Sequence, residues 1–420
     1  MTSQANQVGH AQGYYDTHTH LLVNCRSCSV DTKAGLIECN WQPSYTLTVP
    51  SAWITGVYLV KFTDANGFQT YVPFDVLGNF QSCYVAVTPD TTYAAYNDWG
   101  GYNLYHNLYR INKITYGNLS NLQRGVKVSF DRPYSDSYGS SQVLVHEVDA
   151  IHWLERQGYD LSYINNVDLH ENPTQLLRHR AYLSLGHDEY WTKEMRDGVE
   201  YARDNGIGLA FLDANAAYWQ IRFESDSAGV TNRTIVCYKV ITAHKDLTRD
   251  PLYGKDNTRV TSRWRDPVLN RPENSLIGIM YSSVANHHVN YPWRVSSLAK
   301  SRLLDGTGLM PGRQYGCALA GNEWDRIFAN GATPPGLQVL GTSPTISDFN
   351  KHDISNTTYY IAPSGAMVFA TGSLNWTYAL DSYRYATYYL CAGQNPVVPG
   401  MQKLMAHVMD ELIVHHPYSG

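Results

Sequence analysis

Residues 181–212 have the sequence AYLSLGHDEYWTKEMRDGVEYARDNGIGLAFL, and this stretch decides the fold. Ala181-Tyr-Leu-Ser-Leu185 and Ile207-Gly-Leu-Ala-Phe-Leu212 are short apolar runs of the length that strands usually have. Between them, the residues from about Thr192 to Asp204 have helical spacing, with Thr192 as the predicted N-cap. A strand, a helix and a second strand at this spacing predict a βαβ unit, which joins parallel strands.

The same alternation of strands and helices continues on both sides of this stretch. The sequence predicts strands at Tyr84–Thr88, Leu161–Ile164 and Met367–Thr371, and helices at Gln142–Gln157, Thr174–Arg178 and Met401–Val414. We therefore expect an α/β fold with a mostly parallel sheet and a glutamine-amidotransferase-like or flavodoxin-like core. This catalytic domain is predicted to occupy residues 81–420, with a loop-rich insertion at about 237–331.

The first 80 residues have a different pattern. Ser44–Val49, Gly56–Phe62 and Gln69–Val76 alternate apolar and polar residues, as half-buried strands do. An Asp64-Ala-Asn-Gly67 turn separates the last two, and an Asn-Gly pair between alternating runs is a strong hairpin signal. Residues 1–80 are therefore predicted to form a partial β-sandwich-like module in front of the α/β domain.

Composition excludes two classes of partner. The chain has 420 residues, a formal net charge of −5 and a pI near 6.3, with no local cluster of Lys and Arg, so we expect no binding to nucleic acid. No apolar run approaches the roughly 18 residues that a membrane-spanning helix needs. The first twelve residues contain neither a basic head nor a hydrophobic stretch, which predicts a soluble protein without export.

The cysteines point to a reducing compartment. Seven cysteines is an odd number in a chain without a signal peptide, so reduced thiols and a cytoplasmic location are predicted. Cys25, Cys28 and Cys39 could also belong to a zinc knuckle, with His18 and His20 nearby, although a fourth ligand at regular spacing is missing.

Polar and aromatic residues gather directly after three predicted strands. Tyr93-Ala-Ala-Tyr-Asn-Asp-Trp-Gly-Gly-Tyr102, Gly186-His-Asp-Glu-Tyr-Trp191 and Asp213-Ala-Asn-Ala-Ala-Tyr-Trp219 follow them in turn. In an open parallel sheet, ligands bind beyond the carboxyl ends of the strands. These three segments are therefore the predicted site.

The Gly186-His187-Asp188-Glu189 loop allows more than one interpretation. Its acids could simply stabilise the positive end of the following helix, but this accounts for one carboxylate only. Alternatively, a carboxylate and an imidazole could act as a general base or as metal ligands. A cysteine nucleophile is excluded, because His187 occupies the position where the turn would have to hold a cysteine.

Four motifs together resemble the large subunit of N,N-dimethylformamidase and its relatives. They are Ala95-Tyr-Asn-Asp-Trp-Gly-Gly101, Phe130-Asp-Arg-Pro-Tyr134, Gly186–Trp191 and Leu212-Asp-Ala-Asn-Ala-Ala-Tyr-Trp-Gln-Ile-Arg-Phe223. Each motif is short, but all four occur in the order of the family, and the resemblance runs from about Leu36 to the C-terminus. It implies a mononuclear ferric iron held by two tyrosinates and one glutamate, beside a histidine, an asparagine and a second glutamate.

Transferred to this sequence, the resemblance implies Glu189 as the metal glutamate and His187 as its neighbouring histidine. It implies Asn215 as the asparagine, and Glu323, in Gly321-Asn-Glu-Trp324, as the second glutamate. The tyrosine ligands are matched to Tyr96 and Tyr134, with Tyr105 and Tyr93 as rivals.

The resemblance implies an iron-dependent hydrolase of linear amides, related to formamidases and amidases. Iron would activate water and polarise a small-molecule amide, Glu323 would act as general base, and His187 or Asn215 would donate to the oxyanion. A second subunit and the longer N-terminal part of the family are not seen in this chain, so either a homo-oligomer or a complex with a small subunit remains open. A metal-dependent enzyme of another reaction class, or a carbohydrate- or peptide-binding module, are the alternatives.

Overall fold

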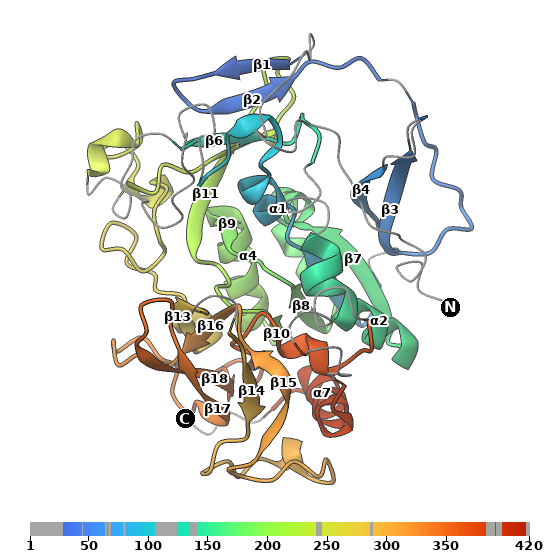
Figure 1. Ribbon diagram of the computed structural model, residues 1–420, viewed down its shortest axis with the longest axis vertical. Helices are drawn as coiled ribbons and strands as arrows, with labels where there is room; N and C mark the ends of the chain where they lie inside the picture. Colours follow the sequence, from blue (N-terminus) through green and yellow to red (C-terminus); the bar gives the residue numbers. More distant parts are fainter. Residues whose placement is uncertain are drawn as a thin grey trace.

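A seven-stranded sheet with the strand order β17-β18-β19-β10-β8-β5-β7 forms the centre of the computed structural model (Figure 1). Strands β7, β5, β8, β10 and β19 run parallel, whereas β18 is antiparallel to both of its neighbours, β19 and β17. The strands are β5 (Tyr84–Thr88), β7 (Leu161–Asn165), β8 (Ala181–Leu185), β10 (Gly208–Leu212), β17 (Gln338–Ile346), β18 (His352–Ile361) and β19 (Met367–Ala370). The structure describes residues 28–43, 45–63, 65, 69–78, 81–105, 124–134, 142–240, 246–285, 289–383, 391 and 397–416.

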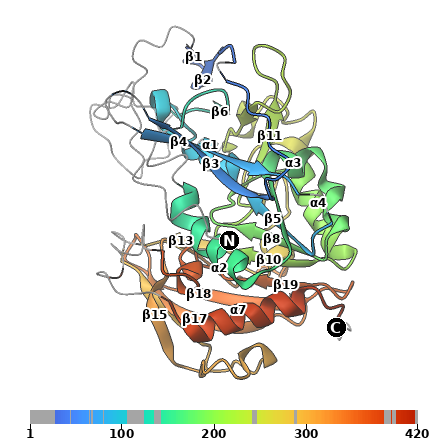
Figure 2. The ribbon, with the colours of Figure 1, turned by 90° about the vertical axis from the view of Figure 1, so that its right-hand side faces the viewer.

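Helices cover both faces of the sheet, because its parallel strands are apolar on both sides. On one face Leu183 and Ala210 share a core with α2 (Val148–Gln157) and α7 (Pro399–Leu412). On the other face Tyr182 packs with residues of α4 (Lys193–Asp204). Figure 2 shows strands β8, β10 and β19 between α4 and α7.

Several small sheets accompany the central one. They are β6-β12-β11-β9, β13-β16, β14-β15, β3-β4 and β1-β2. The remaining elements are β1 (Cys28–Asp31), β2 (Leu36–Cys39), β3 (Gly56–Thr63), β4 (Gln69–Val76), α1 (Asp90–Tyr96), η2 (Trp99–Gly101), β6 (Lys127–Ser129), η5 (Val143–Glu147), α3 (Asn166–Glu171), η6 (Pro173–Arg178), β9 (Tyr190–Thr192), β11 (Trp219–Glu224), β12 (Thr234–Val236), η8 (Leu247–Arg249), η9 (Asn257–Arg259), α5 (Asn274–Ile277), β13 (Met280–Val284), β14 (Tyr291–Arg294), η11 (Arg302–Leu304), β15 (Gln314–Ala320), β16 (Glu323–Arg326) and η12 (Trp376–Ala379).

The prediction of a mostly parallel, glutamine-amidotransferase-like or flavodoxin-like core is wrong, because the central sheet is mixed and small antiparallel sheets surround it. Strands and helices alternate in sequence only as far as β10. After it the chain forms strands β11 to β19 with no long helix between them, and β17, β18 and β19 follow one another through short connections. Short connections of this kind join antiparallel strands, whereas parallel strands need a long crossover.

The small β-sandwich-like module is likewise not seen among the described residues. β3 and β4 form a two-stranded hairpin, from Gly56 opposite Val76 to Thr63 opposite Gln69, and β1 pairs with β2 separately. Residues 45–49 form no strand. The predicted turn at residues 64–67 lies outside the described residues except for Ala65. A sandwich needs two facing sheets, and the described strands supply only separate pairs here. The domain boundaries themselves stay predictions.

The helix at the centre of the quoted stretch is confirmed. α4 begins at Lys193, and the Thr192 hydroxyl accepts a hydrogen bond from the Met195 amide at 3.2 Å. Thr192 is therefore the N-cap, as the sequence predicted.

Two disulfides correct the expectation of reduced thiols. Cys28 pairs with Cys39, and Cys317 pairs with Cys391, while Cys83 and Cys237 are free. Because Cys28 and Cys39 are bonded to each other, they are not available as ligands of the alternative zinc knuckle. The other residues of that alternative, His18, His20 and Cys25, lie outside the described residues. The two disulfides remove the reason that the cysteines gave for a cytoplasmic location, which stays a prediction.

In the part of the chain that the structure describes, no helix combines the length and the apolar character needed to cross a bilayer.

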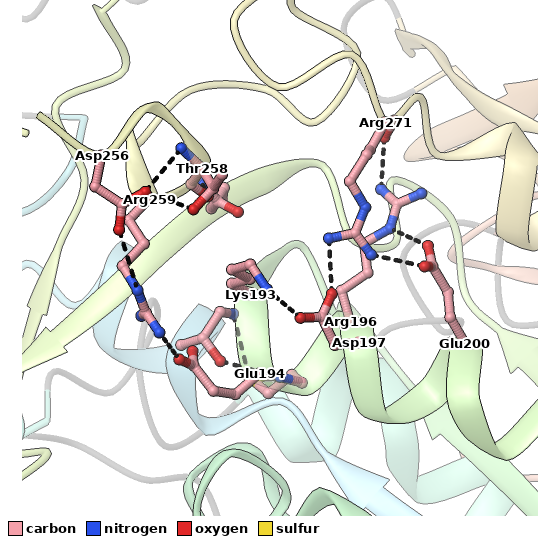
Figure 3. A network of polar contacts seen from close by, with 12 residues as sticks. Lys193, Glu194, Arg196, Asp197, Glu200, Asp256, Thr258, Arg259 and Arg271 are labelled. Atoms are coloured by element: carbon pink, nitrogen blue, oxygen red, sulfur yellow. Dashed lines mark hydrogen bonds and ion pairs between the residues drawn. The ribbon is translucent and has the colours of Figure 1, made fainter. Parts of the chain in front are cut away.

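A network of ion pairs ties α4 to the segment at residues 256–275 (Figure 3). Arg271 bridges Asp197 at 2.7 Å and Glu200 at 2.6 Å. Arg196 also pairs with Glu200, at 2.9 Å, and is completely buried, whereas the Lys193 pair with Asp197 lies near the surface. The two pairs therefore differ mainly in burial.

Arg196 is the buried centre of this network. It donates to the carbonyls of Arg271 at 2.7 Å and Pro272 at 3.0 Å, and its guanidinium lies 4.7 Å from the centre of the Trp264 ring. Because its hydrogen bonds reach backbone as well as Glu200, the side chain fixes the path of the loop that follows Trp264.

We predict that Arg196→Met lowers the free energy of unfolding by about 3 kcal/mol, because it leaves buried acceptors without their donor. Lys193→Met is the matched control, since it removes a partly exposed pair from the same helix, and it should cost less than about 1 kcal/mol. Urea unfolding of both variants and the parent measures the difference. Equal losses in the two variants would contradict the structural role of Arg196.

Candidate functional site

The site forms where three neighbouring parallel strands end. β5, β8 and β10 lie side by side in the sheet, so the segments that leave their carboxyl ends meet at one edge. These segments are α1 after β5, residues 186–189 after β8 and residues 213–217 after β10. The sheet is mixed overall, but this parallel part has the geometry that the sequence predicted.

The loop after β8 needs a glycine at its first position. Gly186 has a φ of +69°, and a Cβ at this residue would collide with the carboxylate of Glu147. The loop then presents His187, Asp188 and Glu189, all of them buried. The Glu189 amide donates to the Thr92 hydroxyl at 3.1 Å, which fixes the loop to α1.

The Glu189 carboxylate accepts hydrogen bonds from two tyrosines. The Tyr96 hydroxyl donates to Oε2 at 2.8 Å, and the Tyr105 hydroxyl lies 2.9 Å from Oε1 and 3.1 Å from Oε2. The two rings are close, with their centres 4.5 Å apart. Two phenols and one carboxylate therefore converge on a single point.

Three further predicted residues surround this carboxylate. His187 Nε2 lies 3.5 Å from Glu189 Oε2 and 3.4 Å from Glu323 Oε2, between the two acids. The Asn215 side-chain amide donates to Glu323 Oε2 at 2.8 Å. The structure therefore brings Tyr96, His187, Glu189, Asn215 and Glu323 together.

Asn215 has a left-handed backbone, with a φ of +58°. Its own amide donates to Asp325 Oδ1 at 2.8 Å, so β16 holds the loop after β10 through both Asp325 and Glu323. Asparagine tolerates this backbone region better than most residues, which fits its place in the loop.

Tyr134 is not brought to this group. Its ring packs against the hydrophobic core that includes Tyr93 and Leu144, and no described hydrogen bond links it to Glu189. Tyr93, the other rival, donates instead to Glu147. Of the four tyrosines considered from the sequence, Tyr96 and Tyr105 are the two that contact Glu189.

Burial shifts the proton affinities in the site. Burial, and then the negative charge of Glu189, raise the pKa of both Tyr96 and Tyr105 well above the ordinary value. Burial lowers the pKa of His187, but Glu323 and Glu189 outweigh it, so that this pKa is raised overall. Burial also raises the pKa of Glu189. The phenols thus keep their protons unless a cation draws negative charge onto their oxygens.

The donor set fits a hard metal cation. Phenolate and carboxylate oxygens prefer highly charged ions such as ferric iron. One buried polar atom beside them, Asn215 Oδ1, has no hydrogen-bond partner within the described chain, as expected where a ligand completes the site. The described residues contain no group of three His, Cys, Asp or Glu side chains suited to a metal, so any such site depends on the tyrosines.

Sequence reasoning missed two residues behind Tyr105. The Tyr190 hydroxyl donates to the Tyr105 hydroxyl at 2.6 Å, and Lys239 Nζ donates to the Tyr190 hydroxyl at 2.7 Å. Burial, and then the Arg124 guanidinium, lower the pKa of Lys239 to about 7. One signal was present, because Lys239 is the single charged residue in the apolar run Ile235-Val-Cys-Tyr-Lys-Val-Ile241.

Comparison with known proteins identifies the family of this chain. Residues 2–389 match the family model described as N,N-dimethylformamidase beta subunit-like, C-terminal. The N,N-dimethylformamidase beta subunit of Paracoccus aminophilus is 24% identical over 414 residues, covering 83% of this chain and 53% of the relative. The same subunit of an Alcaligenes species is 24% identical over 413 residues, covering 82% and 52%. The chain spans about half the length of these relatives.

We predict that Gly186→Ala lowers the free energy of unfolding by about 2 kcal/mol more than Gly229→Ala does. Both glycines have a positive φ, but only Gly186 faces another side chain, since nothing lies within 4 Å of a Cβ at Gly229. Thermal or urea unfolding compares the two variants. If the two variants show the same decrease in the free energy of unfolding, the close contact between Glu147 and the loop does not constrain the site.

Proposed function

Because the chain belongs to the family described as N,N-dimethylformamidase beta subunit-like, C-terminal, we propose that it is a metal-dependent hydrolase of linear amides. The observation that supports this proposal is the convergence of Tyr96, Tyr105 and the Glu189 carboxylate. His187, Asn215 and Glu323 lie directly beside that point. This arrangement combines a metal-binding group with acid and base groups for hydrolysis.

The metal that we propose is a single ferric ion, held by Tyr96, Tyr105 and Glu189. Tyr105 replaces Tyr134 in this proposal, because Tyr105 contacts Glu189 and Tyr134 does not. When bound, such an ion supplies Lewis acidity, polarising an amide carbonyl and acidifying water without a change of oxidation state.

The remaining groups have roles that follow from their positions. Glu323 is the proposed general base, because its carboxylate is the second acid of the site and is oriented by the Asn215 amide. His187 lies between the two acids, and its raised pKa favours the protonated ring, which can donate to an oxyanion. Asn215 thus orients the base, and its unpaired Oδ1 can accept a hydrogen bond from an amide N–H of the substrate.

A partner chain is part of the proposal. The relatives are named as beta subunits, and this chain spans about half of their length. The β3–β4 hairpin exposes Phe62 and Val72, which are 55% and 40% accessible, beside the partly buried Tyr58 and Phe74. Exposed apolar residues gathered on one hairpin are typical of surfaces that contact another chain, either a second copy or a small subunit.

We predict that the iron-loaded protein is coloured, because phenolate oxygens donate charge to ferric iron. Tyr96→Phe and Tyr105→Phe should each weaken or shift the visible band, and Glu189→Ala should lose most of the iron. Tyr134→Phe is the matched control and should keep the band of the parent. Metal analysis and visible absorption provide the readout. A colourless iron-loaded parent would refute the two-tyrosinate site, and a band lost in Tyr134→Phe alone would return Tyr134 to the site.

We predict that Glu323→Gln lowers kcat for amide hydrolysis by about 100-fold or more, because a general base contributes about 10²–10⁴-fold. Iron content and colour should stay unchanged, since Glu323 is not a proposed ligand. Glu411→Gln, on the surface of α7, is the charge-matched control. A screen of small linear amides, esters and other substrates identifies the reaction. Activity on other substrates with none on amides would favour a different enzyme class, and an absence of bound metal would favour a binding module.

A further inference from the structure

Lys239 is a buried lysine in an aromatic surrounding. It is 2% exposed, and no carboxylate within the described chain pairs with it. Its Nζ lies 3.5 Å from the centre of the Tyr105 ring and 4.7 Å from that of Trp219. An amine held against aromatic faces is stabilised by cation–π attraction when it is charged.

The backbone around Lys239 is held in place from several sides. Lys239 has a φ of +51°, a conformation that a non-glycine residue adopts at a cost of about 1–3 kcal/mol. The buried Arg124 donates to the carbonyl of Tyr238 at 2.6 Å and to that of Cys237 at 3.4 Å. The Tyr238 amide donates to the Thr261 hydroxyl at 2.8 Å. The surrounding structure thus maintains a strained position for this one side chain.

The hydrogen bonds that connect Lys239 to Glu189 run in one direction. The amine donates to Tyr190, Tyr190 donates to Tyr105, and Tyr105 donates to Glu189. In its charged form the Lys239 amine has no acceptor atom, so it can only donate to the Tyr190 hydroxyl. No comparable relay from a buried lysine reaches Tyr96 in the described part of the chain.

We propose that Lys239 and Tyr190 are positioning residues for Tyr105, whose hydroxyl they orient toward Glu189, so that they set the affinity of the metal site and the character of one of its two tyrosine ligands. The inference rests on the proposed function. It goes beyond that function because it gives the two proposed tyrosine ligands different surroundings, with the relay behind Tyr105 and not behind Tyr96.

The physical reason is the usual effect of outer-shell partners on metal ligands. A donor behind a ligand fixes its orientation and stabilises its anionic form, and loss of such a donor typically weakens metal binding about 10–100-fold. Tyr190 supplies this donor to the Tyr105 oxygen, and Lys239 in turn fixes the Tyr190 hydroxyl. Tyr105 is thus supported from behind in a way that Tyr96 is not.

The experiment compares the parent with Lys239→Met, Tyr190→Phe and the surface control Lys193→Met. Each apoprotein is titrated with ferric nitrilotriacetate while iron content and the visible absorption band are recorded, and urea unfolding checks that each is folded. Tyr190→Phe removes only one hydroxyl, so it tests the relay even if Lys239→Met unfolds. We expect both relay variants to bind iron about 10-fold more weakly with a shifted band, and Lys193→Met to match the parent.

The outcomes separate the two proposals. If the parent binds iron with colour and folded Tyr190→Phe keeps the affinity and band of the parent, the relay has no positioning role and the inference is overturned. If the shift appears in Lys193→Met as well, the effect is not specific and the inference is also overturned. A parent that binds no iron refutes the proposed function itself, and this is seen before any variant is compared.

Discussion

The carboxylate of Glu189 is only 2% exposed, and taking it out of water is unfavourable unless other groups compensate for the lost hydration. Tyr96 and Tyr105 supply hydrogen bonds, the Thr92 hydroxyl holds the backbone, and His187 lies at ion-pair distance. These contacts at the edge of the sheet therefore all stabilise the Glu189 carboxylate or hold its backbone in place. Its second acidic neighbour, Glu323, raises the electrostatic cost and makes a cation at this position favourable.

Three residues with a positive φ shape the segments around Glu189. Gly186 turns the chain where a side chain would strike Glu147, Asn215 turns it after β10, and Lys239 turns it after β12. Glu147 itself belongs to the π-helical turn η5, a form that is rare and often found at functional sites. Of these three residues, Lys239 is the one for which this backbone region is costly, and such positions are often found at functional sites.

The family model matches most of this chain, whereas this chain covers only about half of its relatives. Every residue of the proposed site lies in the part of the chain that the family model matches. The chain nevertheless spans about half the length of the relatives, and its hairpin β3–β4 has no described third strand. The residues of the proposed site therefore all come from this one chain.

The sequence by itself determined the local elements and most of the site. Buried strands such as Ala181–Leu185 and the capped helix after Thr192 follow from short-range spacing, and the polar residues after each strand marked the edge where the candidate site lies. Only the tertiary structure decided the pairing of β17 and β18, the two disulfides, and the contact of Tyr105 with Glu189. These depend on contacts between residues far apart in the chain. Tyr105 and Lys239 are separated from Glu189 by 84 and 50 positions, and no local pattern records which of 33 tyrosines meets that carboxylate.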